Sequence, residues 1–257
     1  KIISRFGVGT DTVDMDYATQ NGIWVGVTPL ASCRSVAEHA IALLLACAKN
    51  IYSVASHVKK NDWLYRNSIT GCDIEGKTLG LIGLGRIGRH VAEMACGLGL
   101  KVIAYDQYLQ PSDSPENITI VPTLAKLLQE SDFISIHCPI TPETRNMISE
   151  KELASMKRGA ILINTARGQI IDENALFRAL ESGHLRAAGL DVSQVEPPDP
   201  KNPLLALDNC MITSHMAAVT DEAMYRMGMH AAYNIDDVLQ GKEPQWPANR
   251  PDIRRKI

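Results

Sequence analysis

The chain has 257 residues and a formal net charge of −3 at pH 7, and it is 45% hydrophobic and 21% charged. The length allows one large domain or two unequal ones, and the apolar fraction excludes a mainly disordered chain. The mild acidity argues against a dedicated nucleic-acid surface, which needs a basic excess. The longest uncharged apolar run, residues 40–48, is about half of what a bilayer span requires, so we expect no membrane partner.

The cysteines do not form a pattern. The sequence contains six of them, scattered, with no C-x-x-C pair and no Cys/His ligand spacing. A disulfide-stabilised secreted domain would be denser in cysteine, and a zinc site would need clustered ligands. We therefore expect reduced thiols, a cytoplasmic protein and no metal site.

The first residues form a strand–helix–strand pattern over 1–11, 14–21 and 22–28, which is a piece of an α/β unit. The sequence opens with Lys1 rather than Met, so we expect it to begin inside a longer protein. Residues 35–57 then predict one long helix, because apolar residues recur at helical spacing.

Between residues 78 and 215, short apolar runs alternate with amphipathic stretches. The runs lack polar alternation and predict strands buried on both faces: 78–83, 101–106, 133–139, 160–165, 187–192 and 210–215. The stretches between them predict helices: 86–98, 123–129, 149–156 and 173–181. This order predicts an α/β fold with a doubly wound parallel sheet, the Rossmann type.

Residues 221–239 predict another amphipathic helix, with a Pro-containing tail after it. We expect residues 34–221 to form the Rossmann domain. We expect residues 1–33 and 222–257 to form part of a second, smaller domain.

A glycine-rich turn joins the first central strand to its helix. Gly83, Gly85 and Gly88 form a G-x-G-x-x-G motif there. Gly83 permits the tight turn, Gly85 lets the backbone approach a pyrophosphate, and Gly88 lets the helix pack closely on the strand. The motif alone is a weak signal, and a turn without a ligand is the alternative, but its position predicts dinucleotide binding.

Asp106 lies 18 residues beyond Gly88, at the end of the next strand. A carboxylate there accepts hydrogen bonds from the adenosine ribose and repels a 2′-phosphate. Gln107 and Tyr108 supply no cation for that phosphate. The cofactor prediction is therefore NAD rather than NADP.

Three more strand ends carry candidate catalytic groups. Arg167, Glu196 and His215 each follow or end a predicted strand, at the edge where open α/β sheets bind ligands. Each has an ordinary alternative: a solvated arginine, a surface acid, or a histidine with satisfied hydrogen bonds. Together they suit hydride chemistry on a 2-oxo acid. A guanidinium binds a carboxylate, a histidine exchanges the hydroxyl proton, and a neighbouring acid orients the imidazole.

The chain resembles the D-isomer-specific 2-hydroxyacid dehydrogenase family, which includes phosphoglycerate dehydrogenase, glyoxylate/hydroxypyruvate reductase and D-lactate dehydrogenase. The resemblance extends over nearly the whole chain. The motifs that carry the resemblance are 5–11 (RFGVGTD), 35–39 (SVAEH), 76–80 (GKTLG), the glycine turn, 137–139 (HCP) with Thr141 and Thr144, 164–168 (NTARG), 189–192 (GLDV) and His215.

The resemblance implies a role for each matching catalytic position. Arg167 would bind the substrate carboxylate and carbonyl, His215 would be the acid/base, and Glu196 would be paired with it. The backbone of Val8 and Gly9 would face the substrate carboxylate. The smaller domain would be part of a flavodoxin-like α/β substrate domain whose N-terminal strands and helices lie upstream.

The resemblance also implies nucleotide contacts at Gly83, Gly85, Arg86, Ile87, Gly88, Asp106, His137, Cys138, Pro139, Thr144, Thr165, Ala166 and Asp191. Arg86 and Ile87 would meet the pyrophosphate, and Cys138 would act through its backbone. Thr165 and Ala166 would line the nicotinamide side, and Asp191 would hold the carboxamide.

Two further expectations concern assembly and departures from the family pattern. The helix over 35–57 carries more apolar surface than one buried stripe needs, and the resemblance implies that it lies at a twofold interface, so we expect a homodimer. Its apolar residues include Ile41, Leu43, Leu44, Leu45 and Ile51. Ser214 stands where the family usually has Pro and Ala218 where it often has Gly, and we expect both to tune the site rather than abolish it.

The predicted function is NAD-dependent hydride transfer between the nicotinamide and a small D-2-hydroxy acid or its 2-oxo partner. An NAD(H)-sensing corepressor of the C-terminal-binding-protein type is the alternative, because such proteins keep the same three residues. Two assays distinguish the enzyme from the corepressor: turnover of a panel of 2-oxo acids, and binding of a partner that depends on NAD. Formate dehydrogenases are a weaker match, since they carry Gln where Glu196 stands.

Overall fold

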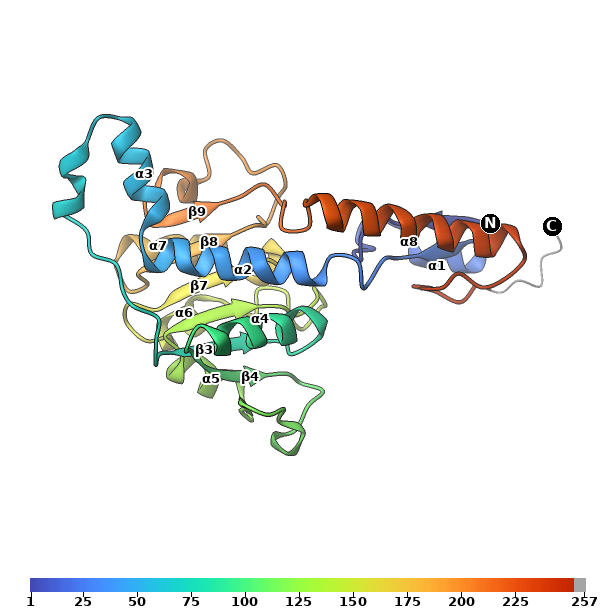
Figure 1. Ribbon diagram of the computed structural model, residues 1–257, viewed down its shortest axis with the longest axis horizontal. Coiled ribbons are helices and arrows are strands. Elements are labelled where there is room, and N and C mark those ends of the chain that lie inside the picture. The colour runs from blue at the N-terminus through green and yellow to red at the C-terminus, as the bar shows by residue number, and fades with distance from the viewer. Residues whose placement is uncertain (252–257) are drawn as a thin grey trace. The chain divides into compact units, whose positions relative to one another are not determined.

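The computed structural model describes residues 1–251, which pack as two compact units (Figure 1). Unit 1 combines Lys1–Ser35 with the chain from Ala218 onward, and unit 2 is Val36–Ala217. Each unit has its own strands and is described by itself.

Unit 2 contains a sheet of seven strands within the described residues: β3 (Thr78–Ile82), β4 (Lys101–Tyr105), β5 (Ile118–Ile120), β6 (Phe133–Ile136), β7 (Ile161–Asn164), β8 (Ala187–Leu190) and β9 (Cys210–Ile212). The order across the sheet is β5-β4-β3-β6-β7-β8-β9, and every pairing is parallel. The predicted doubly wound sheet is confirmed. Strand order reverses between β3 and β6, which places the ligand-binding crevice of such a fold at their carboxyl ends.

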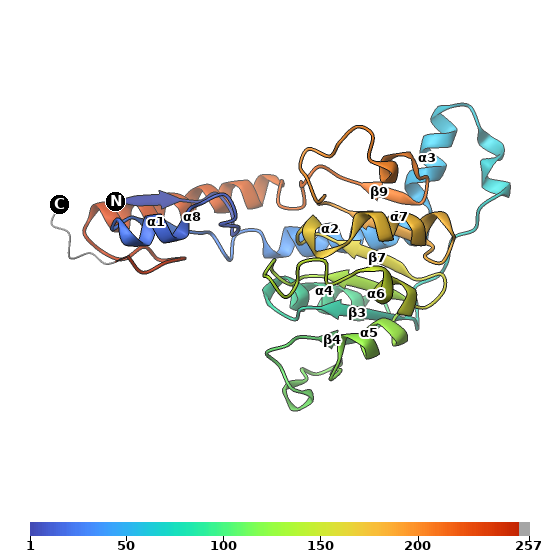
Figure 2. The same ribbon diagram turned by 180° about the vertical axis from the view of Figure 1, so that it is seen from behind.

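Two layers of helices cover the sheet. The helices are α2 (Cys33–Ala48), α4 (Arg86–Gly97), α5 (Leu124–Glu130), α6 (Glu150–Ser155) and α7 (Glu173–Glu181). Helices α2 and α4 share one apolar core with the sheet, and α5, α6 and α7 share the other. Figure 1 shows α2 and α4 in front of the sheet, and Figure 2 shows α6 and α7 in front from behind. Because both faces are covered, the strands are mainly apolar without regular polar alternation, as the sequence predicted.

The single long helix predicted over residues 35–57 is wrong. The chain forms α2 and then α3 (Ile51–Lys59), which meet at an angle of 66°. Asn50 between them has a left-handed φ of 53°, a conformation that asparagine adopts more readily than most residues and that ends a helix. Among residues 1–251 no single helix is long and apolar enough to cross a membrane, although α2 and α3 pass that test together as a bent pair.

The segment after α3 holds a short 3₁₀ turn, η1 (Trp63–Asn67). Its Tyr65 ring stacks on the His57 ring, with centroids 3.6 Å apart. His57 also bonds Asp62 through Nδ1 at 2.9 Å and Asp208 through Nε2 at 3.2 Å. These two carboxylates raise the pKa of His57, so its protonated form ties the segment to the loop before β9.

Unit 1 contains β1 (Ile2–Ser4), α1 (Met15–Gln20), β2 (Trp24–Gly26) and α8 (Asp221–Leu239). The two strands pair in parallel, and both are shorter than predicted. Asn234 of α8 is fully buried beside them, donating from Nδ2 to the Val27 carbonyl at 3.0 Å and accepting from the Trp246 N–H at 3.1 Å. Gly26 has no room for a side chain, because an added Cβ would lie 2.9 Å from the Asn234 amide nitrogen.

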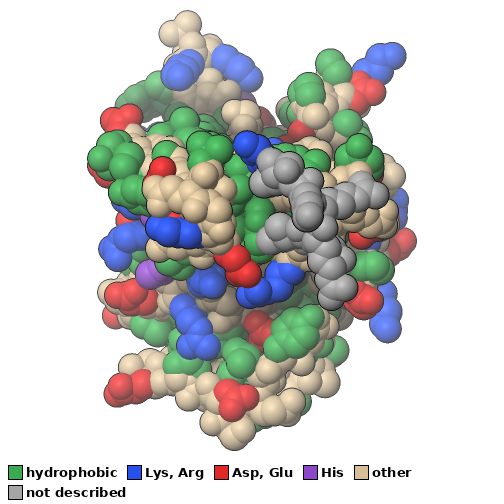
Figure 3. All heavy atoms as spheres, turned by 90° about the vertical axis from the view of Figure 1, so that its right-hand side faces the viewer, with side chains coloured by type: hydrophobic (Ala, Val, Ile, Leu, Met, Phe, Trp, Pro, Cys, Tyr) green, Lys and Arg blue, Asp and Glu red, His purple; other side chains and the backbone are tan. Residues whose placement is uncertain are grey.

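Short 3₁₀ turns connect several elements of unit 2: η2 (Pro111–Asp113), η3 (Gly168–Ile170) and η4 (Pro203–Ala206). On the face drawn in Figure 3, basic and acidic side chains are interspersed rather than gathered into a patch of one sign. All six cysteines are unpaired thiols. No group of three His, Cys, Asp or Glu side chains in residues 1–251 could hold a metal ion.

Candidate active site

The glycine turn lies at the carboxyl end of β3 and opens α4. Gly83 is buried with a φ of +96°, and an added Cβ would lie 2.9 Å from the His137 carbonyl carbon at the end of β6. An added Cβ on Gly88 would overlap the Gly83 carbonyl oxygen. Gly85 differs, since an added Cβ there would meet nothing within 4 Å. Two glycines thus let the turn pack tightly, and the third leaves its outer side open.

The N-terminus of α4 is free to bind an anion. Gly85 is its N-cap residue and supplies no side-chain hydrogen bond to the first turn. The first N–H groups of a helix have no intrahelical partner, and the helix dipole places positive charge there. Open space at Gly85 and uncapped N–H groups together fit a pyrophosphate. Arg86, the first residue of α4, is exposed beside them.

Asp106, the residue after β4, is hydrogen-bonded to the glycine turn. One carboxylate oxygen accepts the Leu84 N–H at 2.9 Å, and the other accepts the Tyr108 N–H at 3.0 Å. Each carboxylate oxygen has a second lone pair, so ribose hydroxyls can still bind. Asp106 therefore has a role that the sequence did not reveal, because it holds the glycine turn in place.

The predicted His137–Pro139 segment leaves the end of β6, next to the turn. The His137 Nε2 bonds the Ser135 hydroxyl at 2.8 Å, and burial lowers the pKa of His137 to about 4. Burial likewise raises the pKa of Cys138 to about 11. A neutral imidazole and a protonated thiol at pH 7 fit a role for this segment in shape and backbone contacts. Thr144 is buried and donates to the Pro139 carbonyl at 2.8 Å, which fixes the loop.

The end of β7 presents Thr165 and then Arg167. Asn164, fully buried, accepts the Ala166 N–H and donates to the Arg167 carbonyl, both at 2.9 Å, so its side chain shapes the turn. The Thr165 hydroxyl is buried and lacks a hydrogen-bond partner among the described residues. Buried polar atoms normally have a partner, so this hydroxyl at the ligand-facing edge fits a bound group that supplies one.

Arg167 and Gly168 turn the chain away from the sheet. The Arg167 guanidinium donates from Nη1 to the Ala166 carbonyl at 2.7 Å, which directs the side chain along the sheet edge. Gly168 is buried, and an added Cβ would overlap the peptide that joins Ser193 to Gln194. The turn after β7 and the loop after β8 are therefore in backbone contact at this glycine.

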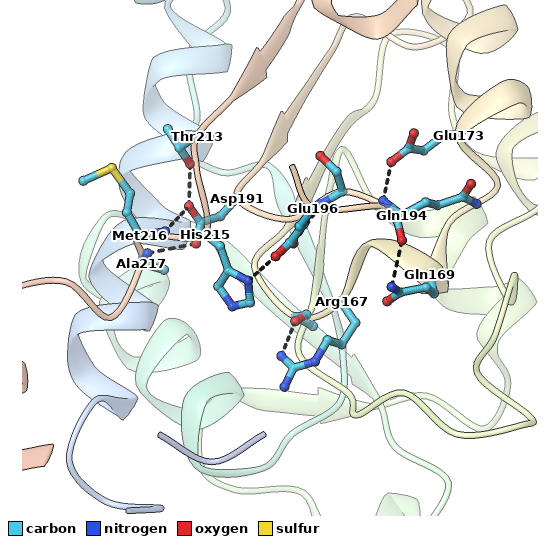
Figure 4. Close-up of polar contacts among 12 residues, drawn as sticks. Arg167, Gln169, Glu173, Asp191, Gln194, Glu196, Thr213, His215, Met216 and Ala217 are labelled. Carbon is cyan, nitrogen blue, oxygen red and sulfur yellow. Dashed lines mark hydrogen bonds and ion pairs between the residues drawn. The ribbon is translucent and has the colours of Figure 1, made fainter. Parts of the chain in front are cut away.

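His215 and Glu196 are a hydrogen-bonded pair. The His215 Nδ1 lies 2.7 Å from one Glu196 oxygen, and the Ser193 N–H donates to the other at 3.1 Å. Since a carboxylate only accepts, Nδ1 carries a proton and Nε2 is the atom left to face a reactant. In Figure 4 the imidazole turns its second nitrogen away from Glu196, to the side on which the Arg167 guanidinium is drawn.

The loop that carries Glu196 is fixed by Gln194. Its backbone N–H donates to Glu173 at 2.6 Å, and its carbonyl accepts the Gln169 side-chain amide at 2.8 Å. Its own side chain donates to the Ile171 carbonyl at 2.8 Å. Figure 4 shows Glu173 and Gln169 on the far side of the loop from His215. The sequence analysis did not select Gln194 or Glu173, because nothing local in the sequence marks bonds that span 21 to 25 positions.

Asp191 makes internal hydrogen bonds that the sequence analysis did not predict. Its carboxylate has no exposed surface in this structure, and its hydrogen bonds are to other parts of the protein. It accepts the Thr213 hydroxyl at 2.6 Å and the N–H groups of Met216 and Ala217 at 2.9 and 2.8 Å. Asp191 therefore holds the segment around His215.

A hollow of about 340 Å³ opens beside the His215–Glu196 pair. Its apolar lining includes Pro197, Leu205 and Ile212.

The predicted residues Val8 and Gly9 belong to unit 1. The Val8 side chain is exposed, and the Gly9 carbonyl accepts the Nε–H of Arg5 at 3.0 Å.

The strand order and the glycine turn at its reversal point define a Rossmann-type dinucleotide-binding domain. Residues 41–217 match the family model described as "D-isomer specific 2-hydroxyacid dehydrogenase, NAD binding domain", so the chain belongs to that family and its nucleotide is NAD.

Individual relatives agree with this assignment. The chain is 44% identical over 255 residues to D-3-phosphoglycerate dehydrogenase of Methanocaldococcus jannaschii, covering 98% of this chain and 48% of that protein. It is 46% identical over 237 residues to hydroxypyruvate reductase of Thermotoga maritima, covering 91% and 76%. It superposes on D-lactate dehydrogenase with NAD+ from Lactobacillus jensenii with a TM-score of 0.84 at 33% identity, covering 97% and 79%. The chain thus spans about half the length of the phosphoglycerate dehydrogenase that it matches.

Proposed function

We propose that the protein containing this chain is an NAD-dependent oxidoreductase that interconverts a small D-2-hydroxy acid and its 2-oxo acid. The observation that carries the proposal is the 2.7 Å contact between His215, which follows β9, and Glu196, in the loop after β8. Arg167 follows β7, the neighbour of β8 in the sheet. The relatives are named as dehydrogenases and reductases, which favours an enzyme over the corepressor alternative.

Each of the three side chains has a separate task in the proposed reaction. The nicotinamide of bound NAD(H) supplies or accepts the hydride. Arg167 binds the substrate carboxylate through its guanidinium, which fixes the position of C2. In reduction, His215 gives the proton on Nε2 to the C2 oxygen, and in oxidation it takes that proton back from the hydroxyl. Glu196 accepts the Nδ1 proton and stabilises the imidazolium by its charge.

NADH oxidation by the full-length protein tests this function. The substrates are glyoxylate, hydroxypyruvate, pyruvate and phosphohydroxypyruvate, because the named relatives act on acids of this size. We expect at least one of them to be reduced in a reaction that the matching 2-hydroxy acid and NAD reverse, with the D-isomer active where C2 is a stereocentre. Failure with all four, in a protein that binds NADH, would contradict the proposal.

We expect NAD(H) to bind more tightly than NADP(H). We expect Asp106→Ala to reduce the difference between these two affinities. The variant removes the charge that repels a 2′-phosphate, and it also releases the Leu84 N–H that holds the glycine turn. The affinity for NADH should therefore fall by a larger factor than the factor by which the affinity for NADPH changes. Asp113→Ala is the matched control, since Asp113 caps a nearby exposed turn. Fluorescence titration of both nucleotides measures the gap, and equal affinities in the parent protein would contradict the prediction.

We also propose a homodimer, supported mainly by residues that follow α2. Ile41, Leu43 and Leu44 are buried in the core of unit 2, so they leave no apolar surplus on α2. Ile51, also among the residues first considered, is exposed at the start of α3, and Trp63 and Leu64 of η1 are 65% and 69% exposed. Trp63→Ser with Leu64→Ser should shift a dimer towards monomer in sedimentation velocity. A parent protein that is monomeric at micromolar concentration would contradict the proposal.

A further inference from the structure

The 35–39 motif has no part in the reaction described above, although it ends in a histidine that reaches the site. His39 lies on α2, and its Nε2 is 3.1 Å from the Thr213 hydroxyl and 3.5 Å from a carboxylate oxygen of Asp191. We propose that His39 is a positioning residue, whose Nε2–H fixes the Thr213–Asp191 pair that holds His215 in its reactive conformation. The activity part of this proposal rests on the proposed function.

Asp191 binds the segment around His215 at several points. Besides the side-chain bonds given above, its backbone carbonyl accepts the His215 N–H at 2.7 Å. The same carboxylate therefore holds residues on both sides of His215, while the carbonyl holds His215 itself. The imidazole direction depends on how firmly Asp191 holds residues 213–217.

This firm hold is needed because His215 has a left-handed φ of 54°. An L-residue with a side chain adopts that conformation at a cost in free energy, and it persists only where the surroundings impose it. With weaker bonds to Asp191, the segment would relax towards an ordinary φ. The imidazole would then lose its alignment with Glu196.

The proton positions follow from the donors present. The Thr213 hydroxyl has one hydrogen, and its 2.6 Å contact with Asp191 uses that hydrogen because a carboxylate only accepts. The hydroxyl can therefore only accept from His39, so Nε2 of His39 is protonated. The 3.5 Å separation places the same N–H towards the Asp191 oxygen as well.

The charge state of Asp191 is consistent with this assignment. Burial acts to raise its pKa, but the hydrogen bonds from His39, Thr213, Met216 and Ala217 together hold the pKa below the usual range. A buried carboxylate that stays ionised needs all of its donors. Of these donors, His39 is the one that comes from a helix rather than from the 213–217 segment, so it links α2 to the site.

Two substitutions at position 39 separate positioning from simple packing. His39→Leu keeps an apolar side chain of moderate size without a donor. His39→Gln keeps an N–H donor at about the same reach, and glutamine suits a helix. We expect amide hydrogen exchange over 213–217 to become at least tenfold faster in the leucine variant and to return towards the parent rate in the glutamine variant.

Steady-state kinetics provides the second measurement. The leucine variant should lose at least tenfold in kcat, within the ~10²-fold that a misplaced catalytic group costs, with little change in NADH affinity. The glutamine variant should recover most of that loss. Equal exchange and equal kcat in the two variants would overturn the proposal, because packing would then account for both. If the parent reduces no 2-oxo acid, the proposed function fails, while the exchange measurement still tests the role of His39.

Discussion

Replacing His215 by alanine should lower kcat by roughly 10²–10⁴, the usual range for loss of a general acid–base. The 2.7 Å bond to Glu196 uses Nδ1, so the proton that is transferred to or from the substrate is carried by Nε2. NADH affinity should stay near that of the parent, because His215 is assigned no contact with adenine or pyrophosphate. The measurements are steady-state kinetics with the best 2-oxo acid and a direct NADH titration. Near-parental turnover by His215→Ala would show the proposed mechanism to be wrong.

The partner variant shows whether Glu196 acts through the imidazole. Glu196→Gln keeps a side chain that can bond Nδ1 but removes the charge. Alone it should reduce kcat. Combined with His215→Ala, it should cost little beyond His215→Ala alone, because the group through which it acts has gone. A double variant whose loss equals the product of the two single losses would assign Glu196 an independent role.

The arrangement of Arg167, Glu196 and His215 could be predicted because it depends on strand order. The apolar runs that end before these residues are parallel neighbours, β7, β8 and β9, so their carboxyl ends meet at one edge. Parallel strands covered on both faces are apolar throughout, which makes them easy to recognise. The glycine turn was predictable for a related reason, since close packing at Gly83 and Gly88 leaves no room for a side chain.

Other features depend on contacts that no local pattern encodes. β5 has three residues, too few to show a period, and it forms only because β4 supplies an edge to pair with. The break between α2 and α3 depends on the left-handed backbone of Asn50 within an otherwise helical apolar pattern. The internal bonds of Asp191 reach partners 22 to 26 positions away, so no local sequence pattern could show them.

The loops that carry Arg167 and Glu196 depend on one glycine. Gly168 follows Arg167 directly, and its backbone touches the Ser193–Gln194 peptide, which leads into Glu196. An added methyl group would overlap backbone atoms, which cannot turn aside as a flexible side chain can. The Gln194 N–H of that peptide donates to Glu173, the Gln194 carbonyl accepts from Gln169, and the Ser193 N–H donates to Glu196. The two loops therefore cannot separate without breaking these bonds.

Gly168→Ala should lower the free energy of unfolding by about 3 kcal/mol, the upper part of the usual range for overpacking, and should lower turnover as well. The matched control is Gly97→Ala. Gly97 is an exposed residue of α4 where an added Cβ meets nothing within 4 Å, so alanine there should be neutral or stabilising by up to ~1 kcal/mol. Urea unfolding gives the two free energies, and kinetics with NADH gives the turnover. Because the overlap lies between the loops of Arg167 and Glu196, the variant should lose activity even at temperatures where it remains folded. Parental stability together with parental turnover in Gly168→Ala would show that the two loops can move apart without disturbing the site.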